Sequence, residues 1–236
     1  MKIFILIFVV TVIDNENNGG AYAGTPSIHS ERFTSDAVIH QLFELLRNLI
    51  RTGSTEYEIP VFDPYESEHV NFIVDSEILR FNTNDTNSIL TGLGDFVLQQ
   101  FNFTKTEVAT NLIIHWPLIT IRSEYYELEG DIYNAIPLSG HGVLDFEVHT
   151  LEFRGKMYLK QSINGKSILI DKFEAPRFSI DKVVSRSDID GSIDTIFNSM
   201  VEDLLAGYLT RFSKYLTGRY STSIIQHLNP ILEKFD

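Results

Sequence analysis

Apolar residues recur along the chain with different spacings, and each spacing indicates a different kind of element. Between residues 35 and 51, in SDAVIHQLFELLRNLIR, they come every three or four positions, which is typical of one face of an amphipathic helix. Thr34 or Ser35 can cap the start of this helix, and Gly53 follows it as a stop signal. From Ile59 to Ile180 the spacing changes to two, as expected for strands with one buried face.

The alternating region predicts about seven or eight long strands. The dipeptide Asn164-Gly165 lies between two apolar runs and predicts a tight hairpin. The parity of the apolar positions changes between Val148 and Leu151, which predicts a bulge near His149-Thr150. No helical pattern separates the strands, so we expect them to form an antiparallel sheet, because parallel pairs need long crossovers.

From Ile193 onward the apolar residues come in pairs separated by polar pairs. This pattern predicts a helix of about 26 residues with a wide apolar stripe. We expect Gly218 to end it, and a shorter helix to follow from Ser223 to Phe235, kinked or divided at Pro230. The order of helix, strands and long helix predicts an α+β fold in which a curved antiparallel sheet covers the long helix.

The N-terminus has the pattern of a signal peptide. One lysine precedes an apolar run from Ile3 to Ile13, which is too short to cross a bilayer, and Ala21-Tyr22-Ala23 supplies an A-x-A cleavage pattern. We therefore expect a secreted protein with a signal peptide at residues 1–23 and a single mature domain at residues 24–236. A buried N-terminal strand is the alternative. No other run in the sequence is long and apolar enough to span a membrane.

Composition limits the partners. The formal net charge is −13, so the surface repels nucleic acid and anionic lipid headgroups, and we expect neither nucleic acid nor stable membrane insertion. The chain has no cysteine, which excludes disulfides, thiolate metal ligands and cysteine nucleophiles. The sequons Asn84-Asp85-Thr86 and Asn102-Phe103-Thr104 predict glycosylation at Asn84 and Asn102.

One stretch, YYELEGDIYNAIPLSGHG at residues 125–142, raises the question of catalysis, because His141 lies between two glycines. Ser139 would share a strand face with His141, yet this pair lacks an orienting acid and an oxyanion site. The sequence contains neither H-E-x-x-H nor G-x-S-x-G, and its histidines show no metal-ligand spacing. We therefore expect no catalytic residue, metal or cofactor, and we interpret Gly140 and Gly142 as positions for a bend or a close strand approach.

Five short motifs, in order between roughly residues 33 and 235, resemble the takeout and juvenile-hormone-binding proteins of insects, which are secreted lipid carriers of about this length. The matching segments are the Ile59-Pro60 and Asp63-Pro64 pairs, Leu90–Phe96 in ILTGLGDFVL, Tyr126–Gly142 with its glycines and Pro137, Ile196-Phe197-Asn198, and Leu228–Phe235 with Pro230.

The resemblance implies a long helix cradled by a strongly curved sheet, an N-terminal helix and an internal hydrophobic tunnel, a fold related to the bactericidal/permeability-increasing proteins. This chain departs from the family pattern in two respects. It lacks the family's N-terminal disulfide, and Ser199, Met200 and Val201 stand after Asn198 where the family usually has a tryptophan. The second departure changes the expected lining, so the family's hormone specificity is not carried over.

We therefore expect a non-enzymatic carrier of a small hydrophobic ligand, such as a terpenoid, a fatty acid or a similar lipid. The alternative is an interaction protein of the same fold that acts through its surface on a receptor or a microbial lipid. The ligand is expected to contact apolar residues of both helices and one strand, and Tyr208 could also donate a hydrogen bond to a ligand oxygen. These candidate residues are Leu42, Phe43, Leu46, Trp116, Phe197, Met200, Leu204, Tyr208 and Phe212.

Overall fold

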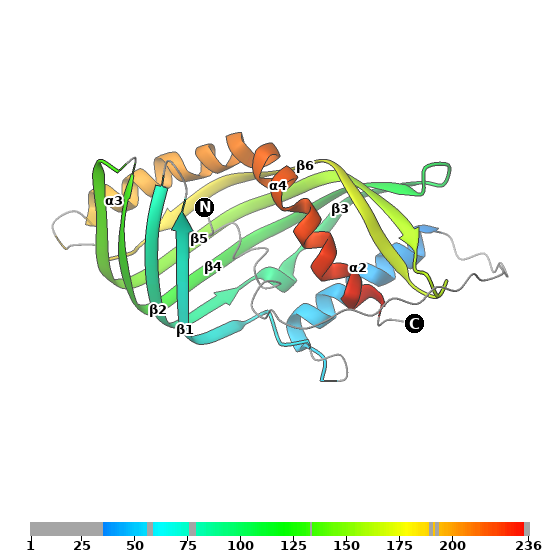
Figure 1. Cartoon of the computed structure of the whole chain (residues 1–236), viewed down its shortest axis with the longest axis horizontal. Coiled ribbons are helices and arrows are strands. Elements are labelled where there is room, and N and C mark those ends of the chain that lie inside the picture. The colour runs from blue at the N-terminus through cyan, green and yellow to red at the C-terminus, as the bar shows by residue number, and fades with distance from the viewer. Residues whose placement is uncertain are drawn as a thin grey trace.

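The computed structural model describes residues 35–55, 59–75, 79–132, 134–188, 191 and 194–233. Within these ranges it contains a six-stranded antiparallel sheet flanked by helices (Figure 1). The predicted signal peptide at residues 1–23 lies outside the described residues. The elements, in chain order, are α2 Ser35–Thr52, β1 Tyr65–Asp75, β2 Leu79–Thr91, the 3-10 turn η1 Leu93–Asp95, β3 Val97–Thr104, β4 Ala109–Ile132, β5 Ile136–Gln161, β6 Ile168–Ser185, α3 Asp194–Met200, the π turn η2 Val201–Leu205 and α4 Ala206–Glu233.

The strands lie in the order β1-β2-β4-β5-β6, and β3 pairs with the part of β4 that β2 does not reach. β4 and β5 have 24 and 26 residues, several times the usual strand length of roughly five or six. The structure therefore has fewer strands than the seven or eight that the sequence pattern predicted, because these two strands are each long enough to take the place of two ordinary ones. The predicted antiparallel arrangement is confirmed.

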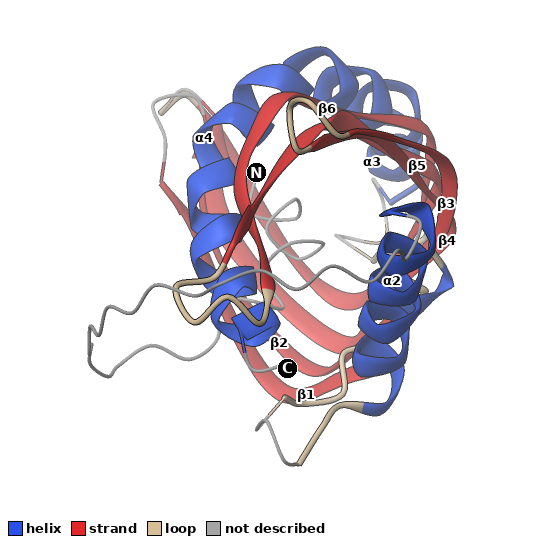
Figure 2. Cartoon of the chain, turned by 90° about the vertical axis from the view of Figure 1, so that its right-hand side faces the viewer, coloured by secondary structure: helices blue, strands red, loops and turns tan. Residues whose placement is uncertain are grey.

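Local kinks give the long strands their curvature. Thr150 has a left-handed φ of 55° in β5, and Ala175 has a φ of 48° in β6. The buried positions of β5 change parity at Thr150, because Val148 and Leu151 are both buried on either side of it. The bulge predicted near His149-Thr150 is not found, since β5 keeps one register with β4 and with β6 on both sides of Thr150. The register shifts instead between Ser123 and Tyr126 of β4 and between Arg154 and Lys156 of β5, and bulges of this kind bend a sheet and increase its twist. Figure 2 shows the result, a sheet that curls in cross-section with α2 and α4 on either side of its open end.

The hairpin predicted at Asn164-Gly165 is also confirmed. Gly165 has a φ of 74° within the turn that joins β5 to β6. Its backbone N–H donates to the carbonyl of Ser162 at 2.9 Å, and Ser162 and Ser167 close the turn by a second backbone hydrogen bond of 2.9 Å.

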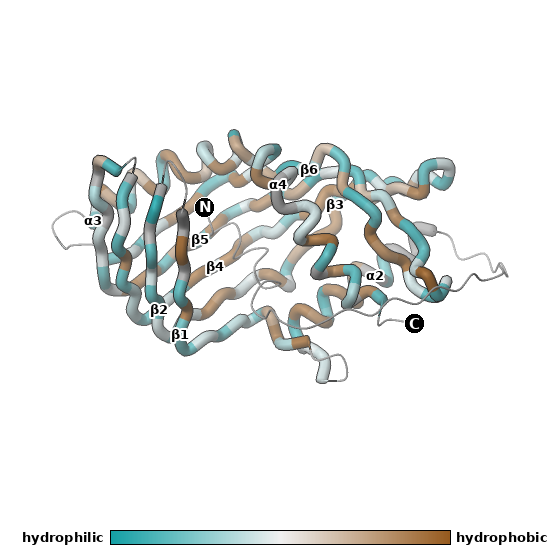
Figure 3. Tube along the Cα trace, viewed as in Figure 1, coloured by the Kyte–Doolittle hydropathy of each residue, from teal (hydrophilic) through white to brown (hydrophobic). Residues whose placement is uncertain are grey.

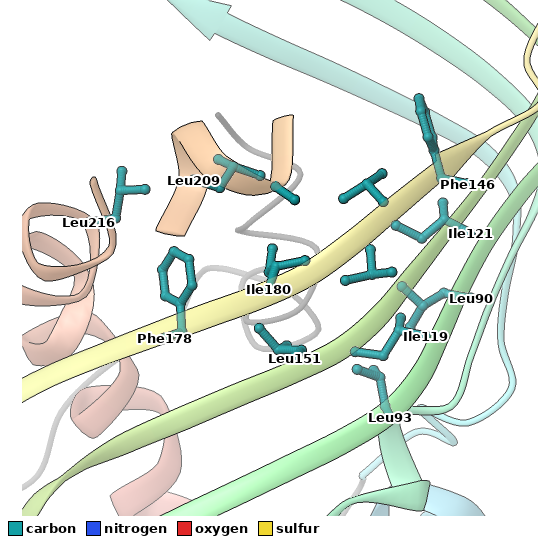
Figure 4. Close-up of a cluster of buried hydrophobic side chains, with 13 residues drawn as sticks. Leu90, Leu93, Ile119, Ile121, Phe146, Leu151, Phe178, Ile180, Leu209 and Leu216 are labelled. Atoms are coloured by element: carbon teal, nitrogen blue, oxygen red, sulfur yellow. The ribbon is translucent and has the colours of Figure 1, made fainter. Parts of the chain in front are cut away.

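Apolar side chains gather on one face of the sheet, and Figure 3 shows how hydrophobic and hydrophilic residues alternate along the long strands. In Figure 4, Leu151, Phe178 and Ile180 of β5 and β6 stand on the same side of the sheet as Leu209 and Leu216 of α4. All five side chains are less than a tenth exposed. A second buried cluster contains Phe43 of α2, strand residues and Leu232 of α4, so the described core has two adjoining parts.

The C-terminal helix is longer than predicted. We expected Gly218 to end it, but α4 continues from Ala206 to Glu233 through both Gly218 and Pro230, although it bends part-way along (Figure 1). A glycine inside a helix costs about 1 kcal/mol relative to alanine. The preceding residues Leu216 and Thr217 are both buried against the sheet side of the molecule, and this packing outweighs the local preference.

Side chains of α4 complete the outer edge of β6, the last strand in the order. Asn229 accepts a hydrogen bond from the N–H of Ile170 at 2.9 Å and donates its amide to the carbonyl of the same residue at 2.8 Å. Thr210 does the same for Ile180, accepting from its N–H at 2.9 Å. An unpaired strand edge leaves backbone groups unsatisfied and invites aggregation. The helix therefore replaces a missing neighbouring strand.

Two more contacts extend this pairing along the strand. Thr217 donates to the carbonyl of Pro176, and Asn198 of α3 accepts from the N–H of Ser187 at 3.1 Å and donates to its carbonyl at 2.9 Å. The contacts run in opposite sequence directions on helix and strand, so the helical segment lies antiparallel to β6 along its edge.

We expect Asn229→Ala to lower the free energy of unfolding by about 1–3 kcal/mol, because the buried Ile170 loses partners for both of its backbone groups. Urea unfolding followed by circular dichroism measures this change. Gln226→Ala, at an exposed position of the same helix, is the control and should differ from the wild type by less than about 0.5 kcal/mol. Equal stability of the two variants would contradict the proposed edge pairing.

Candidate functional site

The described part of the chain forms a partly open apolar cavity of about 150 Å³ between the two helices and the sheet. Its walls come from α2, from β4, β5 and β6, and from the second half of α4. The residues that line it are Phe43, Leu46, Leu112, Ile114, Trp116, Phe153, Met157, Ile170, Phe173, Pro176, Thr217, Ser221, Ile224, Leu228 and Leu232. None of them is ionisable, so the cavity offers neither an acid nor a base.

The N-terminal helix is held over the sheet by Arg47. The guanidinium of Arg47 donates to the carbonyl of Phe96 at 2.8 Å and lies 4.8 Å from the centroid of the Phe96 ring. Phe43, one turn earlier, contacts the same ring edge-on at 6.2 Å between centroids. A cation over an aromatic face and an edge-to-face ring pair both favour a fixed orientation. Phe43 and Leu46 are thereby directed into the cavity wall.

The turn that precedes Phe96 depends on Asp63. Its carboxylate accepts hydrogen bonds from the backbone N–H of Gly92 at 3.0 Å and of Gly94 at 2.6 Å. A Cβ atom on Gly92 would lie 2.1 Å from the carbonyl oxygen of Leu118, and Gly92 has a φ of 92°. Only glycine fits this position. Two sequence motifs that are far apart in the chain, DP and GLG, therefore meet at the base of the cavity wall.

Trp116 forms the centre of the strand wall. Its indole N–H donates to the carbonyl of Leu93 at 3.0 Å, and its ring lies 6.0 Å from that of Phe96. Phe153 and Phe173 form another edge-to-face pair in the wall, at 6.0 Å. Because the indole N–H already has a partner, Trp116 presents only apolar surface to a ligand.

The two hydroxyl groups in the wall are also occupied. Thr217 donates to a main-chain carbonyl, either that of Pro176 or that of Ser213 at 2.8 Å, and Ser221 donates to the carbonyl of Gly218 at 3.1 Å. A ligand in the cavity thus meets apolar atoms and hydroxyls whose protons are already engaged. Such a site binds by removing apolar surface from water, and it has no group placed to make or break a bond.

The structure brings three of the predicted ligand residues together. Phe43, Leu46 and Trp116 all line the cavity, and their contact with a ligand stays a prediction. The backbone of Leu42 lies in α2, but its side chain is outside the described part. Phe197 is half-buried in α3 and does not line this cavity.

The structure places the other four candidates away from this cavity. Met200, Leu204, Tyr208 and Phe212 are between 40% and 61% exposed and are absent from the lining. The apolar stripe of the long helix is wider than the face that packs on β6. Ala206, Leu209 and Leu216 fill that face, and the rest of the stripe is turned to solvent. Tyr208 is therefore not positioned to donate a hydrogen bond into the cavity.

Several lining residues were not predicted, chiefly in the second half of α4 and in the strands after Thr150. Ile224, Leu228 and Leu232 recur at four-residue steps, a visible signal. The sequence pattern predicts a separate short helix for these three residues, and it does not indicate that they lie opposite α2. Met157 and Phe173 had no such signal, because an apolar strand residue can face either a cavity or a filled core.

The structure accounts for Gly142, one of the two glycines beside His141. Gly142 has a φ of 139°, and a Cβ there would lie 2.5 Å from the Cβ of Asp188. The backbone N–H of Val143 donates to the carboxylate of Asp188 at 3.1 Å, and the hydroxyl of Tyr126 donates to the Asp188 carbonyl. Burial raises the pKa of Tyr126, and the charge of Asp188 raises it further, so its hydroxyl remains a donor.

Ser139 and His141, the pair considered above for catalysis, both lie in strand β5. Ser139 and His141 are both exposed in β5, opposite Glu129 and Glu127 of β4. Within the described ranges, no group of three or more histidine, aspartate or glutamate side chains is arranged to hold a metal ion. The sequons lie on strands: Asn102 is exposed in β3, and Asn84 is exposed in β2, where its carbonyl oxygen accepts from the Asn71 amide at 2.5 Å. Glycosylation of either asparagine stays a prediction.

Comparison with known families identifies the chain. The sequence profile of the haemolymph juvenile hormone binding proteins matches residues 4–235. The chain belongs to this family. The predicted resemblance and the predicted fold class are therefore confirmed, although the described structure contains a cavity and the expected tunnel stays a prediction. Among the described helices, none is both long and apolar enough to cross a membrane.

One solved structure supports the fold of this juvenile-hormone-binding-family member. The crystal structure of Epiphyas postvittana Takeout 1 matches with a TM-score of 0.59 and 14% sequence identity, over 84% of this chain and 92% of that chain. A lipopolysaccharide binding protein matches with a TM-score of 0.38 and 15% identity, over 83% of this chain and 39% of that one. A search among curated proteins finds no significant match.

We expect Asp63→Ala to lower the free energy of unfolding by about 1–3 kcal/mol, because the N–H groups of Gly92 and Gly94 lose their acceptor in a partly buried turn. Asp95→Ala is the matched control. Its carboxylate pairs with Arg51 at 2.5 Å on the surface, and removal of a surface pair costs about 0–1 kcal/mol. Urea unfolding of both variants measures the difference, and an Asp95 variant at least as destabilised as the Asp63 variant would contradict this role.

Proposed function

We propose that the protein is a secreted carrier that holds the apolar part of a small lipophilic molecule in the cavity between α2 and α4. One observation carries the proposal: a cavity of about 150 Å³ whose walls contain no ionisable group and no free hydroxyl proton. Membership of the haemolymph juvenile hormone binding family supports the same function. Secretion through a signal peptide at residues 1–23 is part of the proposal.

The size of the cavity limits what it can hold. An apolar cavity of roughly 150 Å³ has room for a ligand the size of benzene. Burial of about 150 Å² of apolar ligand surface contributes roughly 4 kcal/mol, which corresponds to a dissociation constant of only about 1 mM. A tighter ligand must bury more surface than this cavity provides. We therefore propose a terpenoid, a fatty acid or a similar lipid that inserts one apolar end here and continues along the sheet.

The alternative from the sequence is a protein of the same fold that acts through its surface, on a receptor or a microbial lipid, with its groove filled by side chains. The cavity favours the carrier, because a filled groove would leave no room for a ligand between α2 and α4. The carrier needs no catalytic residue, since binding and release involve no bond change.

The single tryptophan of the chain provides a direct assay, because Trp116 lines the cavity. We expect its fluorescence to change on titration with terpenoids or fatty acids. Ser221→Leu, which adds a side chain to the cavity wall, should weaken binding about tenfold or more with little loss of stability. Thr222→Leu, at the next and exposed position of α4, is the control and should bind as the wild type does.

Native mass spectrometry of the secreted protein, followed by denaturation and organic extraction, identifies the ligand. A discrete added mass that is recovered as an extracted lipid supports the carrier. A ligand-free mass, together with no uptake from the panel of terpenoids and fatty acids, would overturn it. Equal binding by the Ser221→Leu variant and the wild type would place the ligand outside this cavity.

A further inference from the structure

A row of large apolar side chains lies exposed on the C-terminal helical segment, which consists of α3, η2 and the first half of α4. Each side chain is between 40% and 62% exposed. The row, which we call the outer stripe, consists of Ile196, Met200, Leu204, Tyr208, Phe212 and Tyr215. Patches of large apolar side chains on one face mark interaction sites far more often than scattered single ones do.

The π turn η2 at Val201–Leu205 keeps the outer stripe in line. Residues at four-residue steps drift about 40° per step around an α-helix of 3.6 residues per turn. A π turn holds more residues per turn than an α turn, and so removes part of this drift. Its position in the middle of the row aligns Ile196 and Met200 with Tyr208 and Phe212. π turns of this kind occur often at functional sites.

The outer stripe differs chemically between its two ends. Its first half is aliphatic, with Ile196, Met200 and Leu204, and its second half is aromatic. The rings of Tyr208 and Phe212 lie 4.7 Å apart and form one surface. Methionine and branched aliphatic side chains pack well on aromatic faces. The two halves are therefore complementary to each other.

The charged residues beside the outer stripe also differ between its aliphatic half and its aromatic half. Asp203 is exposed beside the aliphatic half, and Arg211 and Lys214 are exposed beside the aromatic half. Within the described ranges none of these three side chains forms an ion pair. An antiparallel copy of the segment would bring Asp203 next to Arg211 at both ends of the contact.

The distances along the helix fit an antiparallel pairing. Met200 and Phe212 lie six residues on either side of Ala206, and Leu204 and Tyr208 lie two residues on either side. A two-fold axis at the level of Ala206 thus places Met200 opposite Phe212 of the second copy, and Leu204 opposite its Tyr208. A two-fold interface requires this reciprocity, in which residue i contacts j and j contacts i.

We propose that the outer stripe is a self-association surface that joins two copies of the chain through antiparallel contact of their C-terminal helices. The formal charge of −13 per chain opposes a close approach, and a single helix pair buries less area than a stable dimer requires. The dimer is therefore weak, reversible and dependent on concentration. An anionic membrane is disfavoured by the same net charge.

Sedimentation velocity of the full mature chain, from micromolar to submillimolar concentration at physiological ionic strength, tests the proposal. We expect a concentration-dependent shift from monomer to dimer. Leu204→Asp places a charge in the contact and should raise the dissociation constant about tenfold or more. Ile163→Asp is the matched control, because Ile163 is 62% exposed and lies in the turn between β5 and β6. It should dimerise as the wild type does.

Charge reversal tests the antiparallel geometry itself. Asp203→Arg alone, or Arg211→Asp alone, sets like charges against each other and should weaken dimerisation by about threefold to tenfold. The double variant restores opposite charges at both ends and should recover wild-type association. If Asp203 and Arg211 only stabilised the monomer, the double variant would not recover wild-type dimerisation.

The remaining outcomes overturn the proposal. A chain that stays monomeric at all concentrations has no self-association surface. A dimer that Leu204→Asp leaves unchanged uses another surface. Binding to phosphatidylcholine vesicles that is lost in Leu204→Asp, without any dimer in solution, would make the outer stripe a lipid contact instead.

Discussion

The hydrogen bonds between α4 and the outer edge of β6 are the constraint on which the rest of this structure depends. A long curved sheet has a long edge, and every second residue of that edge has an N–H and a carbonyl without a strand partner. Asn229 and Thr210 supply both a donor and an acceptor to Ile170 and Ile180. These polar contacts fix the helix in register with the strand, and apolar packing of Leu209 and Leu216 then follows.

The cavity is a consequence of this arrangement. Because α4 follows the β6 edge, its second half reaches the end of the sheet where α2 lies, and the two helices become opposite walls. Arg47 and Asp63 hold the other wall by fixing α2 and the turn before Phe96. The space between them is not closed by side-chain packing. Polar contacts at the β6 edge, and the contacts of Arg47 and Asp63 at the opposite wall, thus surround a site that contains no ionisable group.

The wide apolar stripe of the long helix serves two surfaces. One part packs on β6 and belongs to the core, and the other part is exposed beside Asp203 and Arg211. The proposed ligand site and the proposed self-association surface share no residue, because no residue of the outer stripe lines the cavity. Occupation of one surface therefore need not compete directly with the other.

The sequence by itself determined the elements with strong local signals: the α2 helix, the alternating antiparallel strands, the Gly165 turn and the parity change at Thr150. It also indicated the family, and with it the fold. Tertiary packing decided the rest. It carried α4 through Gly218, gave β4 and β5 their length, and left Tyr208 exposed while Leu209 became buried. The reason is that periodicity reports which residues are apolar, whereas the direction each one faces depends on which neighbour covers the element.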